Sequence, residues 1–273
     1  MFRLLVQELK FRRNAILGWG LGLLFFPLVY ISIYPAVAEQ MAELADLEIY
    51  KAMGMTLGTF GDFAGSILII FMPLIASIFA IMNGTGTLAG EEEDGRLEMI
   101  VTLPLKRWEI VTAKAIALNI SSFLIIGINA VVSMLVFNSI QDQITSELRG
   151  INILTAVLST WLLVFAMSMI SMFMAAFLPK RRMASMAAAV VLIIGYFGSN
   201  LAASTELLEP FEPLFLYTYL KATNQALLDG QAAGDMLILL GVGLVAFALT
   251  LVSFQYRRLT VGVWPWQRAK IKT

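Results

Sequence analysis

The sequence predicts an all-α integral membrane protein with six transmembrane helices. Apolar residues make up 59% of its 273 residues, 14% are charged, and the mean hydropathy is +0.82, whereas soluble domains carry about 25% charged residues. A spanning helix needs about 20 apolar residues. Six intervals without Asp, Glu, Lys or Arg reach that length and place the spans, in one domain covering 1–273, at about 15–36, 66–88, 115–137, 152–178, 183–204 and 236–256.

The distribution of basic residues sets the orientation. With the N-terminus inside, 16 of the 19 Lys and Arg residues fall on the cytoplasmic side, and only Lys51, Arg149 and Lys221 fall outside. Cytoplasmic loops carry an excess of Lys and Arg, so we expect both termini in the cytoplasm. The inner loop between spans 2 and 3 is then 89–114, and the outer loops are 39–62, 139–150 and 206–235.

The first 13 residues, MFRLLVQELKFRR, place Leu5, Leu9 and Arg12 at helical spacing. This pattern predicts an amphipathic helix on the inner membrane surface before span 1; a frayed basic tail is the alternative. Ala36-Val37-Ala38 resembles a signal-peptide cleavage site. The apolar stretch before it exceeds the roughly 7–15 residues of a signal core, so we expect span 1 to be retained.

The residue types exclude several kinds of chemistry. The chain has no Cys and no His, which removes disulfides, thiolate metal sites and the usual proton shuttle. The charge-free intervals hold no carboxylate of the kind that intramembrane proton relays use. The run GTGTLAG at 84–90 lacks the Lys of a P-loop, so we interpret it as a site of close helix packing. Zero net charge indicates no nucleic-acid partner.

The loop between spans 2 and 3 holds the densest charge cluster of the chain. Residues from Glu91 to Leu103 are predicted to form one helix, in which Glu92 and Arg96 pair at i,i+4. Pro104 ends it, because proline cannot continue the hydrogen-bond ladder. The helix has an apolar edge made of Leu97, Ile100 and Val101.

This helix either rests on lipid headgroups or binds a protein. It begins with four consecutive acids, Glu91, Glu92, Glu93 and Asp94. Inner leaflets are usually anionic and repel such a run. The sequence therefore predicts that a protein partner docks on this loop.

Three groups of residues within the spans have two interpretations each. The first lies on one face of span 3 and either lines a substrate path or makes hydrogen bonds between helices: Asn119, Ser122, Asn129 and Ser133. The second consists of methionines that either bind copper(I) or fill apolar space: Met167, Met169, Met172, Met174, Met183 and Met186. The third is a small-residue face of span 5 that forms a dimer seam or packs within one subunit: Ala184, Ala188, Gly195, Ser199 and Ala202.

The stretch GEEEDGRLEMIVTLPLKRWEIVTAK resembles the signature of type-2 (type V) ABC exporter permeases. The matching residues are Glu91, Glu92, Glu93, Asp94, Gly95, Leu97, Leu103, Pro104, Arg107 and Lys114. ELKFRRNAILGWGLG is similar to the beginning of the family's span 1, and YRRLTVG to the end of its span 6. Many relatives carry an acid after the second Arg of that last motif, which this chain lacks.

The resemblance implies a partner and a mechanism. Two permease chains pair, here expected as a homodimer, and two separate ATPase subunits bind ATP and Mg²⁺ below them, so this chain itself is expected to hold no cofactor. The loop acts as the coupling helix that sits in a groove on the ATPase and switches the access of the spans. Its candidate coupling residues also include Arg96, Glu98, Ile100 and Val101.

The expected function is that of a multi-pass permease in the prokaryotic plasma membrane. Its uncharged spans favour an apolar or amphipathic substrate, such as a drug, lipid or hydrophobic peptide, moved at the expense of ATP hydrolysed on the partner. One alternative is a non-transporting sensor or assembly factor that anchors an ATPase. A membrane-embedded enzyme is a second alternative, which the missing His, Cys and intramembrane carboxylates disfavour.

Overall fold

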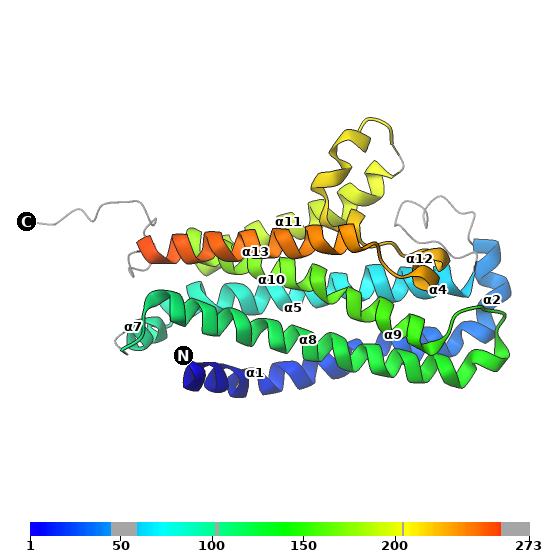
Figure 1. Ribbon diagram of the computed structural model, residues 1–273, viewed down its shortest axis with the longest axis horizontal. Helices are drawn as coiled ribbons and strands as arrows, with labels where there is room; N and C mark the ends of the chain where they lie inside the picture. Colours follow the sequence, from blue (N-terminus) through cyan, green and yellow to red (C-terminus); the bar gives the residue numbers. More distant parts are fainter. Residues whose placement is uncertain (45–58, 102–103, 204, 258–273) are drawn as a thin grey trace, which may run out of the picture.

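A computed structural model describes residues 1–44, 59–101, 104–203 and 205–257, and these residues form helices and loops without a β-strand. They include six helices that are long and apolar enough to cross a membrane, which confirms the predicted fold class. Figure 1 shows these helices running side by side along the long axis of the molecule. The spans are Phe2–Gln40, Phe60–Glu93, Arg107–Gln143, Gly150–Phe177, Arg181–Ala202 and Ala233–Tyr256.

Several spans contain wider or broken turns where the sequence interrupts the helix. Pro27 lies inside a π-helix of span 1, and Pro73 is the second residue of the helix that follows a π-helix in span 2. Proline removes a backbone donor from the hydrogen-bond ladder and so favours such irregular turns. The segments are α1 (Phe2–Leu23), η1 (Phe26–Ile31) and α2 (Ser32–Leu44) in span 1; α4 (Phe60–Gly65), η2 (Ser66–Phe71), α5 (Met72–Thr85) and η3 (Gly86–Gly90) in span 2; α8 (Arg107–Ile140) in span 3; α9 (Gly150–Ser159) and α10 (Trp161–Phe177) in span 4; α11 (Arg181–Ala202) in span 5; and α13 (Ala233–Tyr256) in span 6.

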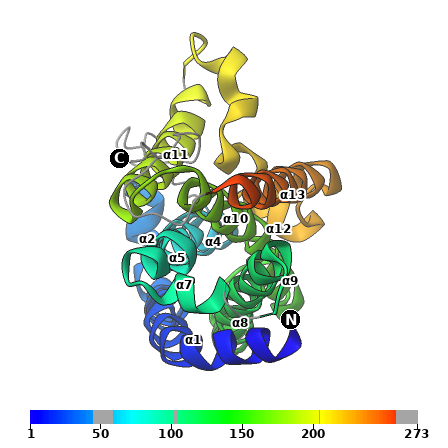
Figure 2. The same ribbon diagram turned by 90° about the vertical axis from the view of Figure 1, so that its left-hand side faces the viewer.

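The N-terminal segment is helical but is not a separate element. Residues 2–13 belong to α1 and join span 1 without a break. Figure 2 shows the first turns of α1 crossing the end of the bundle before the helix turns along it. Phe2 and Phe11 are exposed, whereas Glu8 and Arg12 are buried, so the charged pair of this segment faces the protein and its aromatic residues face outward.

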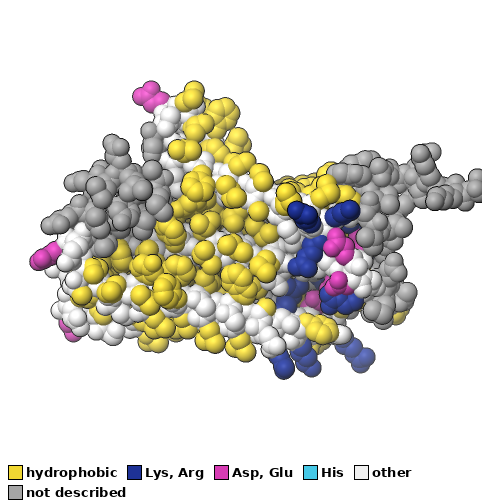
Figure 3. Space-filling view, turned by 180° about the vertical axis from the view of Figure 1, so that it is seen from behind, with side chains coloured by type: hydrophobic (Ala, Val, Ile, Leu, Met, Phe, Trp, Pro, Cys, Tyr) yellow, Lys and Arg dark blue, Asp and Glu magenta, His cyan; other side chains and the backbone are white. Residues whose placement is uncertain are grey.

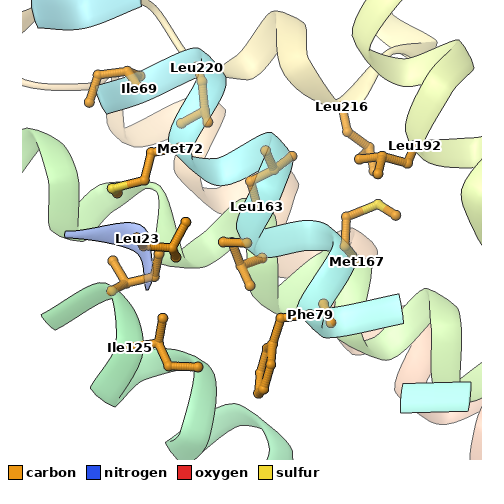
Figure 4. Packing of buried hydrophobic residues seen from close by; sticks show 14 of the residues in the cluster. Leu23, Ile69, Met72, Phe79, Ile125, Leu163, Met167, Leu192, Leu216 and Leu220 are labelled. Atoms are coloured by element: carbon orange, nitrogen blue, oxygen red, sulfur yellow. The ribbon is translucent and has the colours of Figure 1, made fainter. Parts of the chain in front are cut away.

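The core lies where the six spans meet around α10, which packs against α5, α8, α11 and α13. Figure 4 shows side chains of different spans converging there, among them Leu23, Phe79, Ile125, Leu163 and Leu192. A Cβ added to Gly84 would lie 1.9 Å from Ser171 Oγ of α10. The close packing predicted for the glycine-rich run is therefore present at this position.

The loop between spans 5 and 6 contains η5 (Glu209–Leu214), η6 (Leu216–Tyr219) and α12 (Asn224–Asp229). η5 has no buried residue and projects from the bundle (Figure 1), whereas η6 packs against α11 and α12 packs against α4. Tyr217 of η6 is buried and packs edge-on against Tyr196, with ring centroids 5.5 Å apart. Burial raises the pKa of the Tyr217 phenol, so the group stays uncharged. Most of the first outer loop, residues 45–58, lies outside the described part of the chain.

Candidate functional site

The loop between spans 2 and 3 forms two short helices instead of the single helix predicted. They are α6 (Glu91–Glu93) and α7 (Arg96–Val101). Gly95 separates them with φ +72°, a left-handed conformation that other residues rarely adopt. The prediction of one helix was wrong because this turn interrupts it. Leu103 lies outside the described residues.

Lys114 is the centre of a buried ion cluster beneath this loop. Its side chain is 0% exposed, and its Nζ lies 2.5 Å from Glu8 Oε1 and 2.6 Å from Glu91 Oε2. The three residues come from α8, α1 and α6. One ammonium group therefore ties the loop to spans 1 and 3.

Arg12 supplies the second cation of the cluster. Its Nη2 lies 3.6 Å from Glu8 Oε2 and donates to Thr87 Oγ1 at 2.5 Å, and its Nη1 donates to Asn83 Oδ1 at 3.4 Å. The cluster thus contains two carboxylates, Glu8 and Glu91, and two cations, Arg12 and Lys114. Buried charges are tolerated when they are paired and hydrogen-bonded in this way.

Arg257, the first residue after span 6, makes a second buried pair with the loop. Its Nε and Nη2 lie 2.8 and 2.7 Å from Glu92 Oε2, and both side chains are 3% exposed. Its Nη1 also donates to the carbonyls that end α10, at Ala175, Ala176 and Leu178. A cation is favourable at the C-terminal end of a helix. Arg257 therefore joins the loop to spans 4 and 6.

Two further contacts complete the junction. The Arg107 guanidinium, at the start of α8, donates to the carbonyls of Phe254, Gln255 and Arg257 at the end of span 6. Glu93 Oε1 accepts from the backbone N–H of Arg181 at 2.7 Å, where the first turn of α11 favours a negative charge. Through these contacts the loop is bonded, directly or through one residue, to all of the other spans.

Glu91, Glu92 and Glu93 bind residues of their own chain. Glu92 is buried and Glu91 is partly buried, whereas Glu93 is exposed, so the first two acids offer little surface to a partner. The coupling role of the run stays a prediction. The expected pair of Glu92 with Arg96 is wrong. Arg96 instead pairs with Asp94 at 2.7 Å, at the exposed tip of the loop.

The predicted apolar docking edge is wrong in its first residue. Leu97 is 0% exposed and belongs to the core of the protein, so it does not face a partner. Ile100 is half-buried, and the side chains of Glu98 and Val101 are not described. Among the residues of this loop whose burial is described, the exposed ones are Glu93, Asp94, Gly95, Arg96, Pro104, Lys106 and Trp108, the last 47% exposed.

Sequence reasoning missed Glu8, Arg12 and Arg257 as members of the site. Glu8 and Arg12 stand four residues apart, at the spacing of a helical ion pair, which is one signal that could have found them. The other is the number of acids in the loop, because buried carboxylates need cations. The burial itself depends on the distant ends of the spans meeting, and no local pattern records that.

Most of the other candidate residues, in spans 3, 4 and 5, are buried within the chain. Asn129 donates to the carbonyl of Gly20 in α1 at 3.2 Å, so it makes a contact between helices, and it is buried together with Ser122 and Ser133. Asn119 borders an open groove. The small-residue face of span 5 is also buried, against α5, α10 and η6, which agrees with packing within one subunit, the second of its two interpretations. Met167, Met169 and Met172 are buried in the core.

The surface agrees with a membrane-embedded chain that has one charged end. Figure 3 shows a broad apolar middle and a cluster of Lys, Arg, Asp and Glu side chains at the end that carries the loop. The described residues contain no cluster of acids able to hold a metal ion. The site is thus a junction in which buried charges join the loop to the spans.

Comparison with known proteins identifies this architecture. Residues 3–259 match the family described as ABC-2 family transporter protein. The chain belongs to the ABC-2 transporter family. No curated protein matches the chain. As an ABC-2 permease it is the transmembrane subunit of an ABC transporter, and such subunits lack an ATPase domain and work with an ATPase partner.

Proposed function

We propose that this ABC-2 permease is the membrane subunit of an exporter that moves apolar or amphipathic molecules across the prokaryotic plasma membrane. The observation that carries the proposal is the buried ion junction beneath the loop, within a chain that matches the family from residue 3 to 259. The charge-free intervals of the spans support an apolar or amphipathic substrate over a small ion.

In the proposed cycle, two ATPase subunits bind ATP and Mg²⁺ and press on the loop. The contact surface is the exposed tip around Asp94, Arg96 and Lys106, together with Trp108. Because Glu91, Glu92 and Glu93 are bonded to other segments, a displacement of α6 moves the inner ends of several spans together. Such a bistable element can switch the access of a transport path.

Two further parts of the proposal concern topology and assembly. The inner side is the end that carries the loop, where the N-terminus and the end of α13 also lie (Figure 1); the bias of Lys and Arg supports this orientation. The permease acts as a homodimer. Its seam does not involve the buried face of α11, so we place it on exposed surface.

Transport assays in inside-out vesicles test the proposal, with a fluorescent amphipathic dye as the probe. Because the charge-free intervals hold no proton relay, a protonophore should leave the initial uptake rate intact, and ATP depletion should abolish uptake. Uptake that collapses with the proton gradient at constant ATP contradicts the proposal. Intact ATPase binding without ATP-dependent uptake of any of a panel of such dyes favours the sensor or assembly factor.

Co-purification of the ATPase tests the docking surface. Arg96→Glu combined with Trp108→Ala should reduce ATPase recovery, since it changes the charge and removes apolar area at the tip. Lys221→Glu, at an exposed residue of the opposite end, is the matched control and should leave recovery unchanged. Equal recovery with both variants places the docking surface elsewhere.

A further inference from the structure

A groove on the outside of the bundle contains polar side-chain groups, which contact with lipid tails alone would not require. It lies between α8, α10 and α13 and has a volume of about 460 Å³. Its walls are apolar and largely aromatic, and include Phe123, Phe165 and Phe247. Two polar groups in its lining are the side-chain amide of Asn119 and the indole N–H of Trp161. No charged residue lines the groove.

Asn119 Oδ1 and Trp161 Nε1 are both buried and have no hydrogen-bond partner in the described part of the chain. The Asn119 amide nitrogen donates to the carbonyl of Ala115 at 2.8 Å, so its oxygen alone is left over. The Trp161 ring contacts that of Phe123, with centroids 5.4 Å apart, and Phe123 lies one helical turn from Asn119. Asn119 and Trp161, the residues that carry the unpaired acceptor and the unpaired donor, therefore both line the groove close to Phe123.

The position of these atoms makes their lack of partners costly. Trp161 follows a break at Thr160, well inside the 28-residue span 4. Tryptophan in membrane proteins usually lies at the water interface, where its N–H finds a partner. Hydrocarbon offers none, and an unmade hydrogen bond there carries the full desolvation cost. A ligand with a hydroxyl or carbonyl oxygen would satisfy the N–H, and a hydroxyl would also satisfy Asn119 Oδ1.

We propose that this groove binds an uncharged lipid-like molecule that carries a hydroxyl group. The apolar walls take its hydrocarbon body, and Trp161 and Asn119 bind its hydroxyl after small side-chain rotations that expose the two atoms. The absence of charge in the lining disfavours an ion or a phospholipid headgroup. Because binding needs no ATPase motion, this inference does not depend on the proposed transport cycle.

The chain also contains a matched control groove. It lies between α5 and α11, has the same volume of about 460 Å³, and is lined by apolar residues such as Leu74, Ile78 and Ile193 together with Tyr196. None of its described lining residues has a buried nitrogen or oxygen without a partner. Bulk lipid should fill both grooves alike, whereas a hydroxyl-bearing molecule should prefer the first.

Photolabelling in nanodiscs without ATP tests the proposal. Two probes share an alkyl-diazirine tail; one ends in an uncharged glycerol and the other in a methyl group. Labelled peptides are quantified by mass spectrometry as the glycerol-to-methyl ratio in each groove. We expect this ratio to be about fivefold higher in the α8–α10–α13 groove, as one net hydrogen bond would give.

Two variants assign the preference to the polar atoms. Trp161→Phe keeps an aromatic ring beside Phe123 but removes the N–H, and Asn119→Leu removes the acceptor; each should lower the ratio toward that of the control groove. Size-exclusion elution verifies that both variants fold. Equal ratios in the two grooves, or ratios that neither variant changes, would show ordinary lipid contact and overturn the proposal. Labelling by neither probe would show that protein covers the groove, and would also overturn it.

Discussion

Replacing Lys114 with Met tests whether the buried ion cluster holds the loop to the spans. The substitution keeps the length of the side chain and removes the ammonium group that Glu8 and Glu91 share. Their side chains are only 8% and 13% exposed, so both carboxylates lose their main cation without gaining water. Breaking a buried pair in this way costs about 3–5 kcal/mol. Because Arg12 stays 3.6 Å from Glu8, we expect a loss near the lower value, about 3 kcal/mol.

The assay is unfolding in mixed detergent micelles, followed by tryptophan fluorescence as the fraction of denaturing detergent rises. Lys106→Met, at the exposed start of the same helix, is the control and should change stability by less than about 0.5 kcal/mol. Adding Glu8→Gln and Glu91→Gln to Lys114→Met removes the unpaired charges and should recover most of the loss. A loss below about 1 kcal/mol for Lys114→Met, or a triple variant no more stable than the single one, would refute the reasoning.

Three other predictions follow from the same contacts. Gly84→Ala should destabilise the protein by about 1–3 kcal/mol, because the new Cβ would lie 1.9 Å from Ser171 Oγ; Gly127→Ala, where a Cβ meets nothing within 4 Å, should not, and similar unfolding curves for the two would contradict the packing. Gly95→Ala should cost about 1 kcal/mol through its φ of +72°, and Gly95→Asn less, as measured by the same unfolding assay; identical costs would argue against a left-handed turn. Cysteines at Ala188 or Ser199, both buried, should not cross-link two subunits under mild oxidation. Cysteines at Met186 or Ile193, which are 59% and 55% exposed, should cross-link if the exposed face of α11 carries the dimer seam. Efficient cross-linking from Ala188 would place the seam on the buried face instead.

The sequence was sufficient for the parts of the fold that depend on local composition. Long charge-free intervals give the spans, since a bilayer demands length and apolarity and little else. Helix ends were less predictable: span 2 begins at Phe60, not near 66, because polar residues such as Asp62 can stay helical when they are hydrogen-bonded. Asp62 Oδ1 accepts from the backbone N–H of Asn224, 162 residues away, and such a partner is invisible to a local pattern.

The candidate site stays a prediction, but the partners of its acids could not be predicted from the sequence. Four acids in one loop were interpreted as a surface for a partner because the partners of Glu91, Glu92 and Glu93 are distant in sequence. Glu91 and Lys114 are separated by 23 residues, and Glu92 and Arg257 by 165. The apolar character of Leu97 was recognised, but its direction was not, since a six-residue helix after a left-handed glycine can turn either face to the protein. Tertiary contact, and not propensity, decides such elements.

Cross-linking of the loop tip to the ATPase tests directly whether the loop transmits the motion of the ATPase to the spans. The chain has no cysteine, so a single Cys at Asp94 or Arg96 can be paired with an engineered Cys on the surface of the co-expressed ATPase. A control Cys at Glu206, exposed in the outer loop, should give no product. We expect cross-links from both tip positions. We also expect their yields to change when ATP binds, because the loop transmits the motion of the ATPase. Absence of cross-links from the tip in a complex that co-purifies, or yields that do not respond to ATP, would contradict this role of the loop.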